Sequence, residues 1–218
     1  MTLEKQTVVI VDDHPLFRRG LTQLLATLPR FELLGEASCG KDGIDLVKST
    51  RPDLLLLDLN MKDMSGLDVL RAIKAGDLDT RVVMITVSDQ AEDLIAALRA
   101  GADGYLLKDM EPEEMLENLQ SAADGRIIVS EQLTHLLAVA LREQKRPKDP
   151  EEAGLTEQEQ RILERIANGK SNKLIGQELD IAEGTVKVHV KHILRKLNLR
   201  SRVEAAVWSV ENLGKGKH

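Results

Sequence analysis

The sequence predicts two folded units of different class: a doubly wound α/β domain with a five-stranded parallel sheet, (βα)5, joined by a helical linker to an all-α domain of four helices. Short apolar runs alternate with amphipathic stretches over the first 125 residues, whereas no strand pattern follows Leu155. Charge divides in the same way. Residues 1–130 hold 14 Lys and Arg against 23 Asp and Glu, while residues 155–218 hold 12 against 8. An acidic body with a basic tail domain indicates two functions, one of them on a polyanion.

Five apolar runs are predicted as strands: Val8–Val11, Leu33–Ala37, Leu54–Leu57, Val82–Ile85 and Gly104–Leu107. Three of them are continuous runs of Val, Ile, Leu and Met, which is typical of parallel strands buried on both faces. Apolar residues between the runs recur at helical spacing, as in Leu21, Leu24, Leu25 and Leu28. Pro15 and Pro112 stand where the first turn of a helix tolerates proline. Five successive β–α units predict a parallel sheet covered by helices on both sides.

The predicted domain boundaries are residues 1–126, 127–153 and 154–218. The middle segment contains a helical pattern over Glu131–Arg142 and then a charged, proline-containing stretch over Glu143–Gly154. We expect that stretch to be a solvated linker. Thr156 followed by Glu159 predicts a capping box that opens the first helix of the last domain. Three further helices are expected, separated by short turns at Asn168–Gly169, Asp180–Glu183 and Asn198–Ser201.

Three carboxylates follow strands that are neighbours in a doubly wound sheet. Asp12 and Asp13 come after the first strand and Asp58 after the third. In the strand order 2-1-3-4-5 these ends meet at the switch point where such folds bind ligands. Like charges this close raise one another's pKa, and a divalent cation relieves the repulsion. Oxygen ligands with open positions favour Mg²⁺.

A hydroxyl and an ammonium group are expected at the same edge of the sheet. Thr86 ends the fourth strand and Lys108 the fifth. A transferring phosphoryl group needs positive charge and hydrogen-bond donors around its oxygens. Each residue alone would be unremarkable as a turn or surface residue, but together they predict that Asp58 is a nucleophile that becomes an acyl phosphate.

Several motifs resemble the receiver domain of two-component systems over residues 7–125. They are Val-Asp-Asp-His-Pro at 11–15, Leu-Leu-Asp-Leu-Asn-Met at 56–61, Ile-Thr-Val-Ser at 85–88 and Gly-Ala-Asp-Gly-Tyr-Leu-Leu-Lys at 101–108. The resemblance implies that a sensor histidine kinase phosphorylates Asp58. It also implies an Mg²⁺ site, in which Asp13, Asp58 and the backbone carbonyl of Asn60 bind the metal directly and Asp12 binds it through water. The resemblance further implies that Thr86 and Tyr105 form a switch pair that responds to phosphorylation. Many receivers have proline after the lysine, where this chain has Asp109.

A basic helix is predicted in the last domain, because residues 184–203 contain no acid. One face of this helix is apolar and must meet a core. The opposite face carries Lys187, Val188, Lys191 and Arg195. Lysines can reach guanine edges or phosphates and an exposed valine can meet a thymine methyl, which suits the major groove. Thr185, near the start of the helix, could contact a phosphate.

The last helix carries a second apolar stripe. Trp208 is expected in the core, whereas Val203, Val207 and Val210 are candidates for a dimer interface. Residues 154–212 resemble the LuxR-type DNA-binding domain, through Leu-Thr-Glu-Gln-Glu at 155–159 and Thr-Val-Lys-Val-His-Val-Lys-His at 185–192. The two domains together resemble nitrate/nitrite response regulators of the NarL/NarP type. That resemblance implies a nitrate- or nitrite-responsive kinase, paired DNA half-sites bound by a homodimer, and anaerobic respiratory genes as targets.

Other features of the sequence exclude several kinds of site and indicate the cellular location. Cys39 is the only cysteine, so an intrachain disulfide and a cysteine zinc site are excluded. The first apolar run is too short for a signal peptide or a membrane helix. We therefore expect a cytoplasmic protein with no membrane partner. We also expect the acidic first domain to dock on the basic helix and block DNA until phosphorylation releases it.

Two other functions remain open at the level of sequence. An aspartyl-nucleophile phosphatase also uses an Asp at a strand end with Mg²⁺. Such enzymes usually keep a second carboxylate two residues after the nucleophile, and this chain has Asn60 there. A constitutive DNA-binding protein with a protein-docking domain is the second alternative, and in that case Asp58→Ala would not affect DNA binding. We expect a DNA-binding switch rather than an enzyme.

Overall fold

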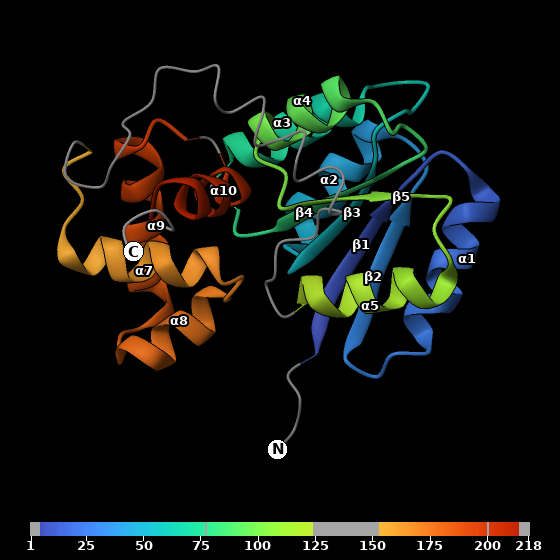
Figure 1. Ribbon diagram of the computed structural model, residues 1–218. Helices are drawn as coiled ribbons and strands as arrows, with labels where there is room; N and C mark the ends of the chain where they lie inside the picture. The colour runs from blue at the N-terminus through green and yellow to red at the C-terminus, as the bar shows by residue number, and fades with distance from the viewer. Residues whose placement is uncertain (1–4, 77, 124–152, 200, 214–218) are drawn as a thin grey trace.

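The computed structural model describes residues 5–76, 78–123, 153–199 and 201–213, which form two domains (Figure 1). The first is built on a five-stranded sheet in the order β2-β1-β3-β4-β5, with every neighbouring pair parallel. The strands are β1 (Gln6–Val11), β2 (Phe31–Ala37), β3 (Leu54–Asp58), β4 (Arg81–Thr86) and β5 (Gly104–Leu107). The doubly wound fold class predicted from the sequence is confirmed.

Helices cover both faces of the sheet, because each parallel connection needs a crossover. They are α1 (Pro15–Ala26), α2 (Gly40–Thr50), α3 (Gly66–Ala75), α4 (Ala91–Ala100) and α5 (Pro112–Ala123). Successive strand residues alternate between the two layers. Val9 packs in the cluster that contains α2, α3 and α4, whereas Ile10 packs in the cluster that contains α1 and α5. This two-sided burial explains the unbroken apolar runs in β1, β3 and β4.

The second domain consists of α7 (Glu157–Ala167), α8 (Asn172–Leu179), α9 (Glu183–Lys196) and α10 (Arg202–Leu213). The predicted capping box is present, with the Thr156 hydroxyl accepting from the Glu159 N–H and the Glu159 carboxylate accepting from the Thr156 N–H. Trp208 is 4% exposed and belongs to the core of this domain, as expected. The apolar stripe of α9 faces the same core through Val186, Ile193 and Leu197.

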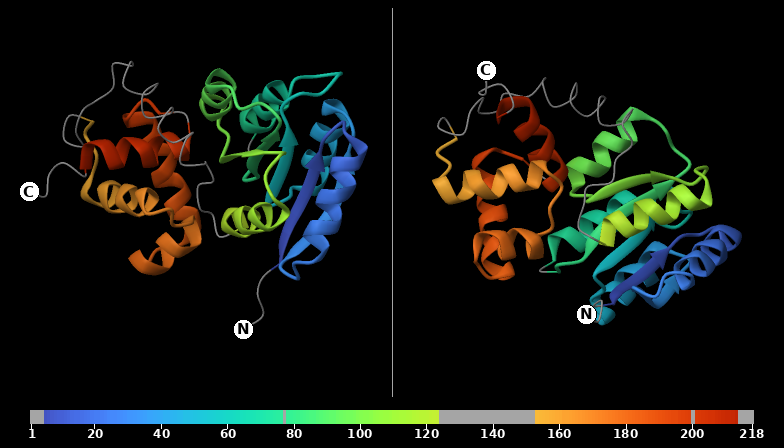
Figure 2. Two further views of the ribbon diagram at one scale, coloured as in Figure 1. Left: turned by 45° about the vertical axis from the view of Figure 1, so that its right-hand side comes forward. Right: turned by 60° about the horizontal axis from the view of Figure 1, so that its bottom comes forward.

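The two domains stand side by side, and the three views agree on this arrangement (Figures 1 and 2). They meet where α10 packs on α4. Val203 is 1% exposed and belongs to the same apolar cluster as the α4 side of the sheet domain. The last helix therefore has two apolar faces, one in its own domain and one against the first domain.

The structure extends three strands beyond their predicted starts, since β1 begins at Gln6, β2 at Phe31 and β4 at Arg81. Most of the predicted linker, including its helix over Glu131–Arg142, lies outside the described residues. Within the part of the chain that the structure describes, none of the helices is long and apolar enough to cross a membrane.

Candidate functional site

The carboxyl ends of β1, β3 and β5 bring two acids and one lysine into contact. Lys108 Nζ lies 2.7 Å from Asp58 Oδ2 and 2.8 Å from Asp12 Oδ2. The register explains the meeting, because β3 pairs with both β1 and β4, and β5 pairs with β4. Their side chains are nearly buried, with exposed fractions of 1% for Asp58, 3% for Asp12 and 7% for Lys108.

The electrostatic environment of Asp58 is balanced between opposing effects. Burial raises the pKa of the Asp58 carboxyl above its ordinary value, the hydrogen bond from Lys108 opposes that rise, and the charge of Asp12 adds to it. The Asn60 N–H also donates to Asp58 Oδ1, at 3.3 Å. Nearby positive charge therefore favours the ionised form of Asp58. A bound cation would favour that form further, and the ionised carboxylate is the nucleophile.

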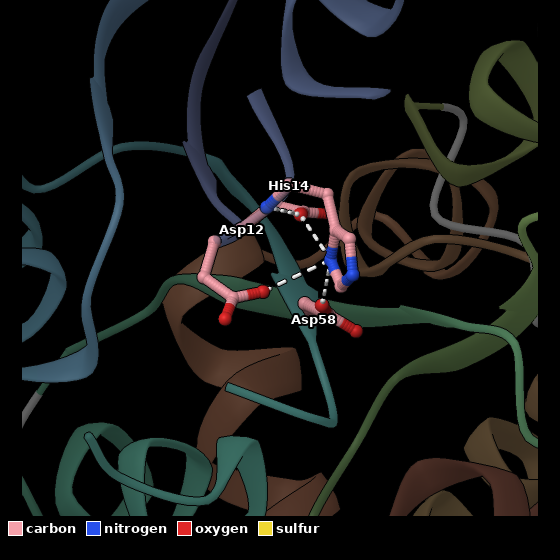
Figure 3. Close-up of side chains that lie close together, drawn as sticks. Asp12, His14 and Asp58 are labelled. Carbon is pink, nitrogen blue, oxygen red and sulfur yellow. Dashed lines mark hydrogen bonds and ion pairs between the residues drawn. The ribbon is translucent and has the colours of Figure 1, made fainter. Parts of the chain in front are cut away.

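His14 belongs to this cluster, although sequence reasoning did not select it. Figure 3 shows its ring beside the carboxylates of Asp12 and Asp58. Its Nδ1 lies 2.9 Å from Asp13 Oδ1 and 3.4 Å from one oxygen each of Asp12 and Asp58. The signal was its place in the Asp-Asp-His-Pro run, because Pro15 opens α1 and leaves His14 as the residue before the first turn.

The cluster fits a divalent cation. One possible ligand atom from each of Asp12, Asp13, His14 and Asp58 falls within 4.8 Å of the other three. Asp13 Oδ1 is buried and accepts no hydrogen bond from the described residues, although the His14 ring nitrogen lies 2.9 Å away. A buried carboxylate oxygen without a donor is costly unless a cation or water occupies its free side. This acidic cluster in such a fold is typical of Mg²⁺ binding.

Thr86 and Tyr105, the predicted switch pair, share one partner. Thr86 is fully buried, and its hydroxyl accepts from the Ser88 N–H at 3.1 Å. The Tyr105 hydroxyl donates to the Ser88 carbonyl at 3.0 Å. Burial raises the pKa of Tyr105 to about 12, so this hydroxyl remains a donor at neutral pH. Ser88 itself, which the sequence did not single out, donates to Asp93 of α4 at 2.5 Å.

The backbone around Asp58 requires a glycine at position 66. A Cβ atom at Gly66 would lie 2.0 Å from the Asp58 carbonyl oxygen and 2.8 Å from the Leu59 Cα. The Gly66 N–H also donates to the Leu59 carbonyl at 2.8 Å. The start of α3 therefore rests directly on the end of β3, and only glycine allows this approach.

The predicted DNA-facing residues lie along one side of α9. Thr185, Val188, Lys191 and Arg195 are exposed, Val188 by 52%. The preceding α8 is followed by Asp180 as its C-cap in a left-handed conformation, and α9 begins three residues later at Glu183. In helix-turn-helix domains this arrangement presents the second helix to the major groove.

Lys187, the remaining DNA-facing residue, contacts the first domain. Its Nζ lies 2.8 Å from Asp79 Oδ2, in the segment before β4. Of the three predicted dimer residues, Val203 and Val207 pack against the first domain, while Val210 is 64% exposed. The first domain thus contacts α9 at Lys187 and also covers part of the apolar stripe of α10.

Two cations of the basic segment have structural partners. Lys196 Nζ lies 2.6 Å from Glu159 Oε2. Arg202 donates from Nη1 to Asn172 Oδ1 at 2.8 Å and from Nη2 to the Lys170 carbonyl, which ties α10 to α8. Burial lowers the pKa of Arg202 to about 10, and Asp103 of the first domain opposes that shift. These residues hold the domain together and are not part of the exposed basic face.

Comparison with known proteins decides the family. The response regulator receiver domain matches residues 8–120, and the bacterial regulatory proteins of the luxR family match residues 153–209. The chain belongs to the two-component response regulators with a LuxR-type DNA-binding domain. A response regulator of this family regulates transcription by binding DNA and is not a typical enzyme.

Similar proteins extend over almost the whole response regulator. The nitrate/nitrite response regulator protein NarL of Escherichia coli K12 is 50% identical over 205 residues, which cover 94% of this chain and 95% of NarL. The nitrate/nitrite response regulator protein NarP of the same strain is 45% identical, covering 95% of each chain. Among solved structures, the response regulator ChrA of a heme-sensing two-component system aligns with a TM-score of 0.51 and 28% identity, over 95% of this chain and 97% of ChrA.

Proposed function

We propose that this response regulator accepts a phosphoryl group on Asp58 from a sensor histidine kinase and then binds paired DNA half-sites as a homodimer. The observation that carries the proposal is the buried contact of Lys108 with both Asp58 and Asp12. This contact supports Asp58 as the acceptor, because the Lys108 ammonium group beside its carboxylate can offset the charge of a phosphoryl group.

The phosphoryl transfer forms one bond and breaks one bond. An Asp58 carboxylate oxygen forms a bond to phosphorus, the phosphorus–nitrogen bond of the kinase phosphohistidine breaks, and the electron pair returns to the imidazole. Lys108 then exchanges its contact with Asp58 Oδ2 for one with a phosphoryl oxygen. The fully buried Thr86, which follows the Asp58-paired Ile85 in β4, supplies a hydroxyl to the same group.

A divalent cation would be held by Asp12, Asp13, Asp58 and the backbone carbonyl of Asn60. When bound, Mg²⁺ offsets the negative charge that gathers around the transferring phosphoryl group. Asp13 contributes the carboxylate oxygen that lacks a hydrogen bond. The protein residues set the position of the acceptor, and Asn60 fixes it through its N–H.

The state of Asp58 would reach the other domain through Ser88 and α4. If Thr86 turns toward a phosphoryl group, its hydrogen bond with the Ser88 N–H is lost. Ser88 also holds Tyr105 and the first turn of α4 through Asp93. Because α4 packs on α10, a shift of this segment loosens the contact that covers Val203.

Release of the second domain would free two surfaces together. Lys187 leaves Asp79 and joins the exposed basic face of α9, which can then enter a major groove. Val203 and Val207 leave the receiver and, with Val210, become available to a second copy. Most of the DNA-facing residues are already exposed before release. Phosphorylation therefore controls dimerisation at least as much as it controls access to these residues.

The names of the relatives support the proposed input signal. NarL and NarP of Escherichia coli carry names as nitrate/nitrite response regulators. The identity of 50% over nearly the whole length supports nitrate or nitrite as the input and respiratory genes as the output of this chain. Binding to chromosomal DNA supports a cytoplasmic location.

Phosphorylation can be tested by locating the modified residue. The protein is incubated with acetyl phosphate and Mg²⁺, and the acyl phosphate is trapped by reduction with borohydride and mapped by mass spectrometry. We expect modification of Asp58 in the wild type and none in Asp58→Ala. Modification at Asp12 or Asp13, or continued release of phosphate from a phosphomonoester, would overturn the assignment. Phosphotransfer from a nitrate-responsive sensor kinase of the same bacterium tests the input.

A further inference from the structure

We propose that Phe17 is a positioning residue for phosphoryl transfer, and that the face of its ring holds the Lys108 ammonium group beside Asp58. Lys108 Nζ lies over the Phe17 ring, 4.8 Å from the ring centre. The inference rests on the proposed function and deepens it, because it names the aromatic side chain that sets where the charge partner of the phosphoryl group stands.

The distance and the burial of Lys108 favour a cation–π contact. An ammonium group within about 6 Å of a ring centre is attracted to the negative face of the ring. The Lys108 side chain is only 7% exposed, so water screens this attraction little. Cation–π contacts are stronger where the cation is desolvated, and the ring therefore offsets part of the hydration that the buried ammonium group has lost.

The carboxylates cannot hold Lys108 in the same way throughout the reaction. Lys108 Nζ lies 2.7 Å from Asp58 Oδ2 and 2.8 Å from Asp12 Oδ2. When Asp58 is phosphorylated, the first of these contacts is exchanged for one with a phosphoryl oxygen. The Phe17 ring is neutral and has no acceptor oxygen, so its contact with the ammonium group does not depend on this exchange. Phe17 is thus the partner of Lys108 that stays the same before and after the transfer.

The packing of α1 on the sheet fixes the ring independently of the acids. Phe17 is the third residue of α1, the helix that begins at Pro15. Its half-buried side chain packs against the apolar cluster that contains Leu21 of the same helix and Leu106 of β5. Leu106 precedes Lys108 by two residues. The helix therefore positions the ring, and the ring positions the ammonium group.

Loss of the aromatic ring should slow the phosphorylation of Asp58. Phe17→Leu keeps a large apolar side chain but removes the negative ring face. We expect modification by acetyl phosphate to slow about three- to tenfold, because only the part of the attraction that acts in the transition state affects the rate. Phe17→Tyr keeps the ring and should restore most of the wild-type rate.

Fluorination of the ring separates its electrostatic effect from its packing. Phenylalanines with one, two or three fluorine atoms, incorporated at position 17 of the full-length protein, retain the shape of the ring while weakening its negative face stepwise. We expect the phosphorylation rate to fall in that order while the melting temperature stays nearly constant. A rate that does not respond to fluorination would show that Phe17 acts through packing alone, and would overturn the inference.

Nuclear magnetic resonance tests the contact without any reaction. The ring current of Phe17 should shift the Lys108 methylene protons beside Nζ upfield in the unmodified wild type. This shift should disappear in Phe17→Leu and remain in Phe17→Tyr. Resonances that are the same in the wild type and Phe17→Leu would contradict the position of the ring over the ammonium group.

Phe31, the other phenylalanine of the chain, provides the matched control. It is 8% exposed in the same apolar cluster, but it begins β2, at the end of the sheet opposite Asp58. Phe31→Leu should lower the melting temperature without slowing phosphorylation. Equal slowing in Phe17→Leu and Phe31→Leu would refute the role of Phe17, while modification of Asp58 in the wild type would leave the proposed function intact. A wild-type protein that is not modified on Asp58 would refute the proposed function, and the inference with it.

Discussion

Lys187 of the recognition helix α9 forms an ion pair with Asp79 of the receiver, with 2.8 Å between Nζ and Oδ2. The Asp79 side chain is 77% exposed and that of Lys187 is 35% exposed. A pair this exposed contributes about 0–1 kcal/mol. The pair therefore orients the two domains but adds little stability to their contact. The apolar packing of α10 against the receiver contributes more.

Asp79→Asn should increase the DNA affinity of the unphosphorylated protein. The expected gain is up to about fivefold at low salt, which corresponds to about 1 kcal/mol for an exposed pair. Fluorescence anisotropy with an operator fragment measures it. Asp45→Asn removes the same charge from an exposed position on α2 and controls for the general loss of acidity. Equal gains in the two variants would show that net charge, and not this pair, limits binding.

Val207→Ala should loosen the docked state, because Val207 packs against the receiver cluster. We expect a larger radius of gyration in small-angle X-ray scattering and faster proteolysis between the domains. Val210→Ala is the matched control, since Val210 is 64% exposed. It should leave the docked state unchanged and weaken only the dimer on DNA. An opened structure in Val210→Ala, or none in Val207→Ala, would contradict the assignment of the two residues.

Gly66→Ala should destabilise the receiver by about 1–3 kcal/mol, because the new methyl group would overlap the Asp58 carbonyl and force the backbone to move. Acetyl phosphate should modify Asp58 more slowly in this variant. Gly20→Ala provides the contrast, since a Cβ there meets no atom within 4 Å and α1 gains a better helix former. That variant should be more stable by about 0.5–1 kcal/mol. Thermal unfolding measures both.

Glu159→Gln should destabilise the DNA-binding domain at neutral pH by about 2 kcal/mol, the usual strength of hydrogen bonds to a charged group. Burial acts to raise the pKa of Glu159, but hydrogen bonds from Lys196 and Thr156 outweigh it and lower the pKa. A lowered pKa means that the contribution is present above the ordinary value of 4.5 and is lost as the pH falls below it. Denaturant unfolding from pH 7 to pH 3.5 should therefore show the two proteins converging. A difference that persists at the acid end would contradict the ion pair.

The sequence predicted those parts of the site that depend on strand ends. Asp12, Asp58 and Lys108 meet because parallel strands end at one edge of the sheet, and this follows from the order of elements alone. The sequence also predicted the capping box at Thr156, because this motif depends only on the local spacing of Thr156 and Glu159.

The parts that the sequence did not predict depend on side-chain direction and on the docking of domains. His14 lies beyond the strand end, and the turn into α1 decides whether its ring faces the acids or the solvent. The stripe containing Val203 was assigned to a second copy, but an apolar helix face alone does not say which surface covers it. Arg202 lies within the acid-free segment 184–203, and the sequence alone does not show that its guanidinium binds Asn172 and Lys170.

Operator binding with and without acetyl phosphate and Mg²⁺, compared between the wild type and Asp58→Ala, tests the central claim most directly. A gated regulator should bind more tightly with the phosphodonor in the wild type only, and should shift from monomer to dimer in the same titration. If the two proteins bind DNA alike under both conditions, the receiver does not control DNA access. It would then serve as a protein-docking module attached to a constitutive DNA-binding domain.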